Sequence, residues 1–198
     1  MRCHSGLPGF DSRRPLHMNV GDRDYTYFMI RHGIFPTSLG DLLFTAEGDA
    51  LTGIYFPDHR YPPSQETMGE DLGFEPEDTV LTETARQLRE YLLGERTTFD
   101  VPLAPHGDDF SQQVWNILID IPYGSTTTYG EIAVRLGNRA LAQRVGQSVG
   151  HNPVSIIIPC HRVLGADGSL TGYAGGLDRK RTLLELEEPE PEAAGRLF

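Results

Sequence analysis

Cysteine is scarce in this chain: Cys3 and Cys160 are the only two in 198 residues. Two cysteines are too few for a disulfide framework at this length, so we expect reduced thiols. Long apolar runs are absent as well. None approaches the ~20 residues needed to cross a bilayer, and residues 1–20 lack the apolar stretch of a secretion signal. We therefore expect a soluble, cytoplasmic protein with no membrane partner.

Net positive charge is also lacking, because the whole chain carries −11. That average argues against DNA binding, which needs local positive charge. The distribution is uneven, however. Residues 110–183 contain seven basic and four acidic residues, a balance of +3, and the rest of the chain carries −14. The segment can therefore approach a polyanion, although ordinary surface charge is the alternative interpretation.

The first half of the chain has the pattern of a small sheet followed by a helix. Short β-branched and aromatic runs predict strands at residues 25–30, 41–45 and 51–56. Residues 61–78 are rich in Pro and Gly and predict a loop. Apolar residues then recur at helical spacing over residues 80–92, and Gly94 ends that helix.

A break at Pro105-His106-Gly107 divides the chain, whose 38% apolar residues suffice for an ordinary core. We predict a mixed α/β (α+β) fold, in which a small N-terminal sheet-plus-helix domain precedes a mostly helical helix-turn-helix domain with the active site. The predicted limits are a flexible leader at 1–24, the small domain at 25–105, the helical domain at 106–187 and a disordered acidic tail at 188–198.

The second half contains a candidate helix-turn-helix. A helix is predicted from about Asp108, and Thr128 with Glu131 matches a capping box at the start of a short helix. Gly137-Asn138 then forms a turn before a second helix at residues 140–149. Arginines lie on or beside this pair, but many helix pairs of this kind never contact DNA. The interpretation as a DNA-binding unit therefore needs support from the chemistry.

Cys160 is the candidate reactive group. Three isoleucines precede Pro159, which prevents a continuous helix, so we expect Cys160 to be held on an extended segment at the edge of the core. A cysteine there is either inert packing or a nucleophile. The neighbours favour the nucleophile, because His161, Arg162 and the basic stretch 179–181 can each stabilise a thiolate.

His161 is the candidate base beside this thiol. Adjacent side chains on an extended chain point to opposite faces, so we expect a bridging water between them. A carboxylate is expected to fix its tautomer, and the last helix offers Glu185, Glu187 and Glu188. Downstream, small residues beside Tyr173 let a flat ligand approach the backbone, although a plain surface loop is the alternative. This candidate substrate pocket comprises Tyr173, Ala174, Gly175 and Gly176.

Together these motifs resemble one family. Ile158-Pro159-Cys160-His161-Arg162-Val163, with Asn152-Pro153 before it and Gly172-Tyr173-Ala174-Gly175-Gly176-Leu177 after it, is similar to the active-site signature of the O6-alkylguanine-DNA alkyltransferases. The resemblance extends over residues 110–187. The first half of the chain resembles the family's variable small domain only loosely.

The resemblance implies irreversible, single-turnover repair of duplex DNA that carries O6-alkylguanine, after the damaged nucleotide rotates out of the stack. O4-alkylthymine is left open as a further substrate. Cys160 then corresponds to the nucleophile, His161 to a base acting through water and Glu187 to the carboxylate that orients it. Tyr129 corresponds to the residue that hydrogen-bonds the departing guanine, and Asn152 to the brace of the active-site turn. Neither a metal nor an organic cofactor is implied, and we expect a monomer.

The DNA-binding residues depart from the family at one position. The resemblance implies DNA contacts from the helix-turn-helix, for which we expect Ser111, Tyr129, Asn138, Gln143 and Arg144. The family usually has Arg-Ala-Val in the second helix, with the arginine filling the gap left by the extruded base, whereas this chain has Gln143-Arg144-Val145. One residue along a helix turns a side chain by about 100°, so either Gln143 fills the gap or Arg144 reaches back to it.

Three other classes of protein compete with this interpretation. A cysteine hydrolase would use Cys160 and His161, but its histidine is usually remote in sequence. A zinc-stabilised module would use Cys3-His4 and Cys160-His161, although adjacent ligands lack the usual spacing. A damage sensor would bind DNA without transfer, and the presence of Cys160 argues against it.

Overall fold

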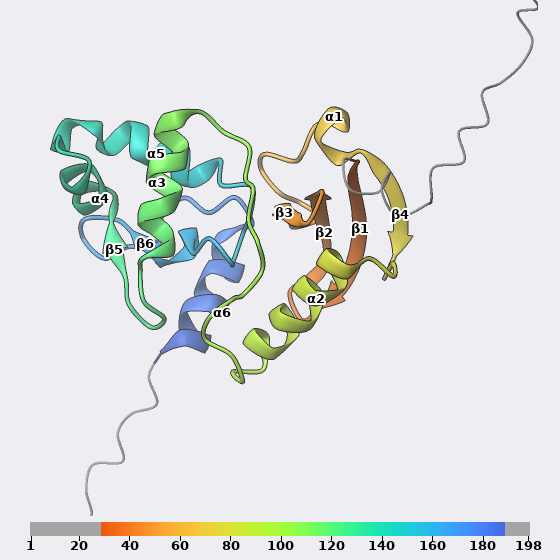
Figure 1. Cartoon of the computed structure of the whole chain (residues 1–198). Coiled ribbons are helices and arrows are strands. Elements are labelled where there is room, and N and C mark those ends of the chain that lie inside the picture. Colours follow the sequence, from red (N-terminus) through yellow and green to blue (C-terminus); the bar gives the residue numbers. More distant parts are fainter. Residues whose placement is uncertain (1–28, 189–198) are drawn as a thin grey trace, which may run out of the picture.

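The computed structural model describes residues 29–188. In Figure 1 a β-sheet with one long helix forms one side of the molecule, and the remaining long helices form the other. This arrangement confirms the predicted fold class, a small N-terminal sheet followed by a mostly helical region. The predicted domain limits stay predictions. The leader, and the tail beyond Glu188, lie outside the described residues.

The sheet has four strands in the order β3-β2-β1-β4, with β1 and β4 parallel and the other pairs antiparallel. Helix α2 lies along it, with Leu81 and Leu88 fully buried against sheet residues such as Leu42 and Phe44. This amphipathic helix and the alternating strands make the N-terminal core. The elements are β1 (Ile30–Thr37), β2 (Gly40–Glu47), β3 (Ala50–Tyr55), α1 (Gln65–Met68), β4 (Glu70–Phe74) and α2 (Thr79–Leu92).

One prediction for this half was wrong, and another lies mostly outside the described residues. The strand predicted at 25–30 is the second of these, while the described part of the chain begins with β1 at Ile30–Thr37, which was not predicted. Its polar start is stabilised by tertiary contacts, since buried Arg31 pairs with Asp78 at 2.5 Å. The predicted loop 61–78 contains a short helix and strand β4. That strand lies at the sheet edge and is largely exposed, so it has no apolar alternation to reveal it.

The C-terminal half contains the predicted helices. Asp108 caps α3, and Thr128 and Glu131 form the predicted capping box at the start of α4. The helix predicted at 140–149 is a 3-10 turn followed by a later-starting α-helix, with the Asn138 side chain capping the turn. The elements are α3 (Asp109–Ile119), β5 (Thr127–Thr128), α4 (Tyr129–Arg135), η2 (Arg139–Leu141), α5 (Ala142–Gly150), η3 (Cys160–Arg162), β6 (Val163–Leu164) and α6 (Leu177–Glu187).

Strand β3 connects the two halves directly behind the active-site turn. The Ile54 amide donates to the Pro153 carbonyl at 2.8 Å, and the Ser155 amide donates to the Ile54 carbonyl at 3.3 Å. The N-terminal sheet therefore supports the segment that leads to Cys160.

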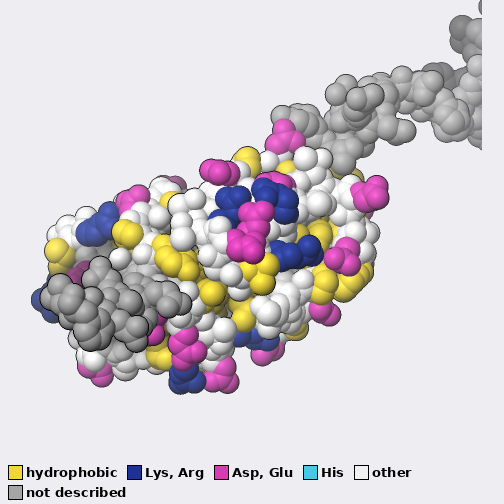
Figure 2. All heavy atoms as spheres, turned by 90° about the horizontal axis from the view of Figure 1, so that it is seen from below, with side chains coloured by type: hydrophobic (Ala, Val, Ile, Leu, Met, Phe, Trp, Pro, Cys, Tyr) yellow, Lys and Arg dark blue, Asp and Glu magenta, His cyan; other side chains and the backbone are white. Residues whose placement is uncertain are grey.

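The surface has mixed charge. On the face shown in Figure 2, basic and acidic side chains lie interspersed with hydrophobic ones. None of the helices in residues 29–188 combines the length and apolar character needed to span a membrane.

Candidate active site

Cys160 begins a single 3-10 turn, η3, so the predicted extended support was wrong. The turn forms because Asn152 organises the preceding loop: its Nδ2 donates to the Ile158 carbonyl at 2.9 Å, and its Oδ1 accepts from the Val154 amide at 3.0 Å. Ile156 has a φ of 74°, which is a strained conformation for a β-branched residue. Asn152 and the surrounding core hold the chain in this conformation.

The thiol of Cys160 is 4% exposed, and the Asn152 Nδ2 lies 3.1 Å from its Sγ. Burial raises the pKa of the Cys160 thiol, and this outweighs the opposing effects of the Asn152 hydrogen bond and the Lys180 charge. Lys180 of the basic stretch thus favours the thiolate, but its effect is smaller than that of burial. A thiol in this state needs a base to become a nucleophile.

His161, which follows Cys160 in sequence, forms a buried pair with Glu187 of α6. The His161 Nε2 lies 2.8 Å from the Glu187 Oε1, and both side chains are almost completely buried. Of the three carboxylates considered from sequence, Glu185 and Glu188 are exposed, and the structure brings Glu187 to the histidine. Because an ionised carboxylate only accepts, the hydrogen-bond network assigns the proton to Nε2.

The other ring nitrogen of His161 is therefore available as a base. Its Nδ1 is buried and has no hydrogen-bond partner among the described residues. Burial lowers the pKa of His161, against the opposing effect of Glu187, which favours a neutral imidazole. A neutral ring with Nε2 protonated presents the Nδ1 lone pair for proton abstraction.

Glu187 is the centre of a larger network. The Nε and Nη2 of Arg162 each donate to it at 2.8 Å, the Tyr91 hydroxyl donates at 2.5 Å, and the Gly124 amide donates at 3.2 Å. Burial alone would raise the pKa of Glu187, but the hydrogen bonds from His161 and Arg162 lower it to about 2. The carboxylate therefore stays ionised at neutral pH.

Sequence reasoning missed one member of this network and misplaced another. The missed residue is Tyr91, which lies on α2 of the N-terminal half. The one sequence signal for it is that a tyrosine on an apolar helix face needs a hydrogen-bond partner for its hydroxyl. Arg162 was expected to stabilise a thiolate, but its guanidinium binds Glu187 and the Ile121 carbonyl instead. Its role is to hold the carboxylate.

Lys180 is the member of the basic stretch that approaches the thiol. It is the only lysine of the chain, it is fully buried, and its Nζ donates to the Val163 and Thr171 carbonyls at 2.5 and 2.7 Å. Burial lowers its pKa to about 8, while the charge of Cys160 opposes this shift. Arg179 and Arg181 pair with Asp58 and Asp178 instead.

A cavity of ≈ 420 Å³ adjoins this site. Tyr173 and Ala174, two of the four residues expected in the substrate pocket, line it together with Tyr129, whose hydroxyl donates to the Thr171 carbonyl at 3.3 Å. Burial and, to a smaller extent, the charge of Cys160 raise the pKa of Tyr173. Burial also raises the pKa of Tyr129, against the opposing effect of the Thr171 hydrogen bond. Its full lining is Arg60, Tyr61, Tyr129, Ala142, Gln143, Gly146, Gln147, Gly150, Thr171, Gly172, Tyr173 and Ala174.

The remaining pocket residues predicted from the loop play a different part. Gly175 and Gly176 are not in the cavity lining. A Cβ on Gly175 would lie 2.3 Å from the Phe56 ring, so this glycine permits close packing between the loop and the N-terminal half. Gly176 has a φ of 88° and precedes α6.

The structure separates the predicted DNA-binding residues. Gln143 lines the cavity, whereas the Arg144 guanidinium lies 3.8 Å above the Phe110 ring and 3.7 Å from the Asp108 carboxylate. The Ser111 hydroxyl donates to Ser148 at 3.0 Å. Asn138 is exposed and caps η2.

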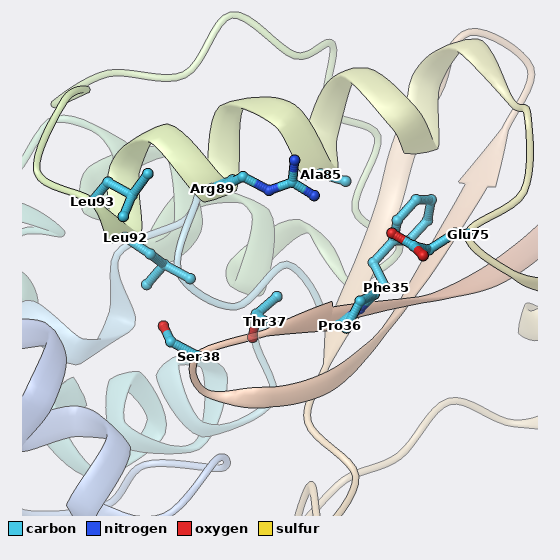
Figure 3. A pocket seen from close by; sticks show the side chains of 9 residues that line it. All are labelled: Phe35, Pro36, Thr37, Ser38, Glu75, Ala85, Arg89, Leu92 and Leu93. Carbon is cyan, nitrogen blue, oxygen red and sulfur yellow. The ribbon is translucent and has the colours of Figure 1, made fainter.

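A second cavity, of ≈ 400 Å³, lies in the N-terminal half between the end of β1 and α2 (Figure 3). Phe35, Leu92 and Leu93 make it largely apolar, and Arg89 extends along one wall. It shares no lining residue with the cavity near Cys160.

Both halves of the chain match family models. Residues 109–189 match the DNA-binding domain of 6-O-methylguanine DNA methyltransferase, and residues 30–105 match its ribonuclease-like domain. The chain belongs to the methylated-DNA–protein-cysteine methyltransferase family.

Relatives in this family match over nearly their whole length. The methylated-DNA–protein-cysteine methyltransferase of Mycobacterium tuberculosis is 44% identical over 86% of this chain and 99% of its own. That of Methanosarcina acetivorans is 44% identical over 79% and 97%. The crystal structure of the M. tuberculosis O6-methylguanine methyltransferase has a TM-score of 0.72 at 42% identity, covering 83% of this chain and 96% of that one. A structure of M. tuberculosis OGT in complex with DNA also has a TM-score of 0.72, at 43% identity over 79% and 92%.

Membership in the methyltransferase family favours transfer chemistry over the cysteine-hydrolase and zinc-module alternatives. Cys160 and His161, one half of the zinc hypothesis, lie in the site described above, where His161 pairs with Glu187. Cys3 and His4, the other half of the zinc hypothesis, lie outside the described residues.

Removing the Glu187 charge is expected to destabilise this protein. In Glu187→Gln the buried Arg162 loses its counter-charge, which should lower the free energy of unfolding by about 3 kcal/mol at pH 7. A carboxyl whose pKa is lower in the folded state than in the unfolded state stabilises the fold at any pH above the unfolded-state pKa. This stabilisation is lost as the pH falls toward the folded-state pKa of about 2. The difference between wild type and variant should therefore shrink below pH 4.5, measured by urea unfolding.

Glu185→Gln is the matched control, because Glu185 is exposed on the same helix. Its unfolding free energy should stay near that of the wild type. An equal loss in both variants, or a Glu187→Gln deficit that is constant down to pH 3, would contradict the network.

Proposed function

We propose that this protein repairs alkylated DNA by moving an alkyl group from the O6 atom of guanine to the Sγ of Cys160. The observation that carries the proposal is the arrangement of the sulfur. Cys160 is held by Asn152 next to a cavity lined by Tyr129 and Tyr173, with the His161–Glu187 pair beside it. A nucleophile, a base and an orienting carboxylate are the groups that such a transfer needs.

The first step is ionisation of the thiol. Because burial raises the pKa of Cys160, the proton must leave through a base, and the unpartnered Nδ1 of His161 is the candidate. We propose that a water molecule relays the proton from Sγ to Nδ1. Glu187 stabilises the imidazolium that forms, and Lys180 stabilises the thiolate electrostatically.

The second step is displacement at the alkyl carbon. The thiolate forms a new C–S bond while the bond from that carbon to the guanine O6 breaks, and the departing guanine takes up a proton. We propose that the Tyr129 hydroxyl, which donates to a carbonyl in this structure, turns to hydrogen-bond the guanine as charge develops on it. The thioether is stable, so each molecule reacts once.

Duplex DNA bearing O6-alkylguanine is the proposed partner. M. tuberculosis OGT has been solved in complex with DNA, and we propose that helices α4 and α5 of this chain are the helix-turn-helix that contacts the duplex. The target atom is inaccessible inside the stack, so the nucleotide must be extruded into the cavity. We further propose that the protein acts as a cytoplasmic monomer, without metal or cofactor, where a reducing environment keeps Cys160 free.

Mass spectrometry of the reacted protein tests this function. After incubation with duplex DNA containing O6-methylguanine, the tryptic peptide of residues 145–162 should gain the mass of one methylene. Cys160→Ser should abolish the gain, and Cys3→Ser should leave it intact. An unmodified peptide 145–162 in wild type would contradict transfer and would favour the damage-sensor alternative.

The residue that fills the gap left by the extruded nucleotide is proposed to be Gln143. It lines the cavity, whereas Arg144 is directed toward Phe110 and Asp108 at the start of α3. A neutral amide fills the gap without the charge of the usual arginine.

Replacing Gln143 should therefore slow repair of duplex DNA. We expect Gln143→Ala to lower the single-turnover rate about tenfold, equivalent to ~1.4 kcal/mol, because the unstacked base is held less well. Arg144→Ala is the matched control and should react at nearly the wild-type rate. A slow Arg144→Ala with a normal Gln143→Ala would assign the role to Arg144, and normal rates in both would remove it altogether.

A further inference from the structure

Arg60 is a cation that the N-terminal half contributes to the cavity beside Cys160. Among the described residues that line this cavity, Arg60 alone carries a charge. The helix-turn-helix supplies no cation there, since Gln143 is neutral and Arg144 is directed elsewhere. The rim on the side of the N-terminal half is therefore the positive part of the opening.

The backbone of Arg60 is fixed to the loop of Tyr173 and Ala174, which also lines the cavity. Its amide donates to the Ala174 carbonyl at 2.9 Å. Two residues earlier, Asp58 pairs with Arg179 at 2.5 Å, and the Arg179 guanidinium lies 4.8 Å from the Phe56 ring centroid. These contacts position residues 56–60 against the cavity.

An aromatic stack holds the next residue. The Tyr61 and His151 rings are stacked with centroids 3.9 Å apart, and His151 follows α5 of the helix-turn-helix. The Arg60 guanidinium lies 5.4 Å from the centroid of the Tyr61 ring. Arg60 thus projects at the junction between the N-terminal half and the helix pair.

The charge of Arg60 has no carboxylate partner within the described part of the chain, where its guanidinium contacts only the Tyr61 ring. The side chain is exposed, and no carboxylate of residues 29–188 forms a salt bridge with it. Eight of the eleven described arginines, such as Arg179, pair with a carboxylate, whereas Arg60, Arg89 and Arg139 do not. An exposed, unpaired guanidinium beside a nucleotide-sized cavity has the chemistry to bind a phosphate.

We propose that Arg60 binds a backbone phosphate next to the extruded nucleotide, which makes the N-terminal half part of the DNA-binding surface. This inference rests on the proposed function, since it requires the damaged nucleotide to enter this cavity. The contact positions the DNA and takes no part in bond making or breaking. It places one positive charge on the strand where the N-terminal half meets the helix pair.

The salt dependence of DNA binding tests the contact. Binding of the full chain to duplex DNA with one O6-methylguanine is measured from low to moderate salt in the Cys160→Ser background, which prevents reaction. Loss of one phosphate contact lowers the slope of log K against log salt by about 0.9. We expect this loss in Arg60→Ala and the wild-type slope in Arg60→Lys. Arg89→Ala, an exposed arginine at the other cavity (Figure 3), is the matched control with an unchanged slope.

The outcomes distinguish failure of the Arg60 contact from failure of the proposed function on which it rests. A wild-type slope in Arg60→Ala would overturn the phosphate contact, and weaker binding with that same slope would show that Arg60 only braces Tyr61. The peptide of residues 145–162 in wild type is analysed in parallel. A methylated peptide with an unchanged Arg60→Ala slope rejects Arg60 alone, whereas an unmethylated peptide rejects the proposed function.

Discussion

The carboxylate of Glu187 is the interaction on which the rest of the site depends. It accepts hydrogen bonds from His161, Arg162, Tyr91 and the Gly124 amide, so donors from three segments converge on two oxygens. A buried carboxylate is unfavourable unless it is paired and hydrogen-bonded, and here every contact satisfies it. Without it, the imidazole would have no group to hold its tautomer.

The same network joins the two halves of the molecule. Tyr91 comes from α2, which packs on the N-terminal sheet, while His161 and Arg162 belong to η3. Strand β3 adds a second connection through Ile54, which bonds the segment before Cys160. The variable small domain of this family therefore supports the reacting sulfur in this chain, even though its own sequence carries no catalytic motif.

Much of the fold and site could be predicted from sequence because the signals were local. The capping box at Thr128 and the apolar periodicity of α2 each depend on a few adjacent residues. Strand β4 could not be predicted, because an exposed edge strand gains its hydrogen bonds from β1 without burying an apolar face.

Within the site, too, only local sequence signals could be used for prediction. The signature indicated Cys160 and His161, and a resemblance was needed to choose Glu187 among three carboxylates. The orientation of Arg162 and the partner of Tyr91 are set by packing between distant segments, which periodicity does not encode. The raised pKa of the thiol likewise follows from burial, which the basic neighbours in sequence did not reveal.

Electrostatics explains how an acidic chain can act on DNA. The acidic surplus lies outside residues 110–183, and the described cavity lining contains no carboxylate. Repulsion of phosphate is therefore weakest where the nucleotide must enter. Because Gln143 is neutral and Arg60 is cationic, the charge in this cavity lining comes from the N-terminal half and not from the helix pair.

The protonation of His161 tests the account most directly. Nitrogen-15 NMR of the unreacted protein at pH 7, with His161→Gln used to assign the signals, reports which ring nitrogen carries hydrogen. The Glu187 contact predicts a neutral ring that is protonated at Nε2 and free at Nδ1. A ring protonated at Nδ1, or an imidazolium in the resting protein, would contradict it, because no base would then be available for the buried thiol.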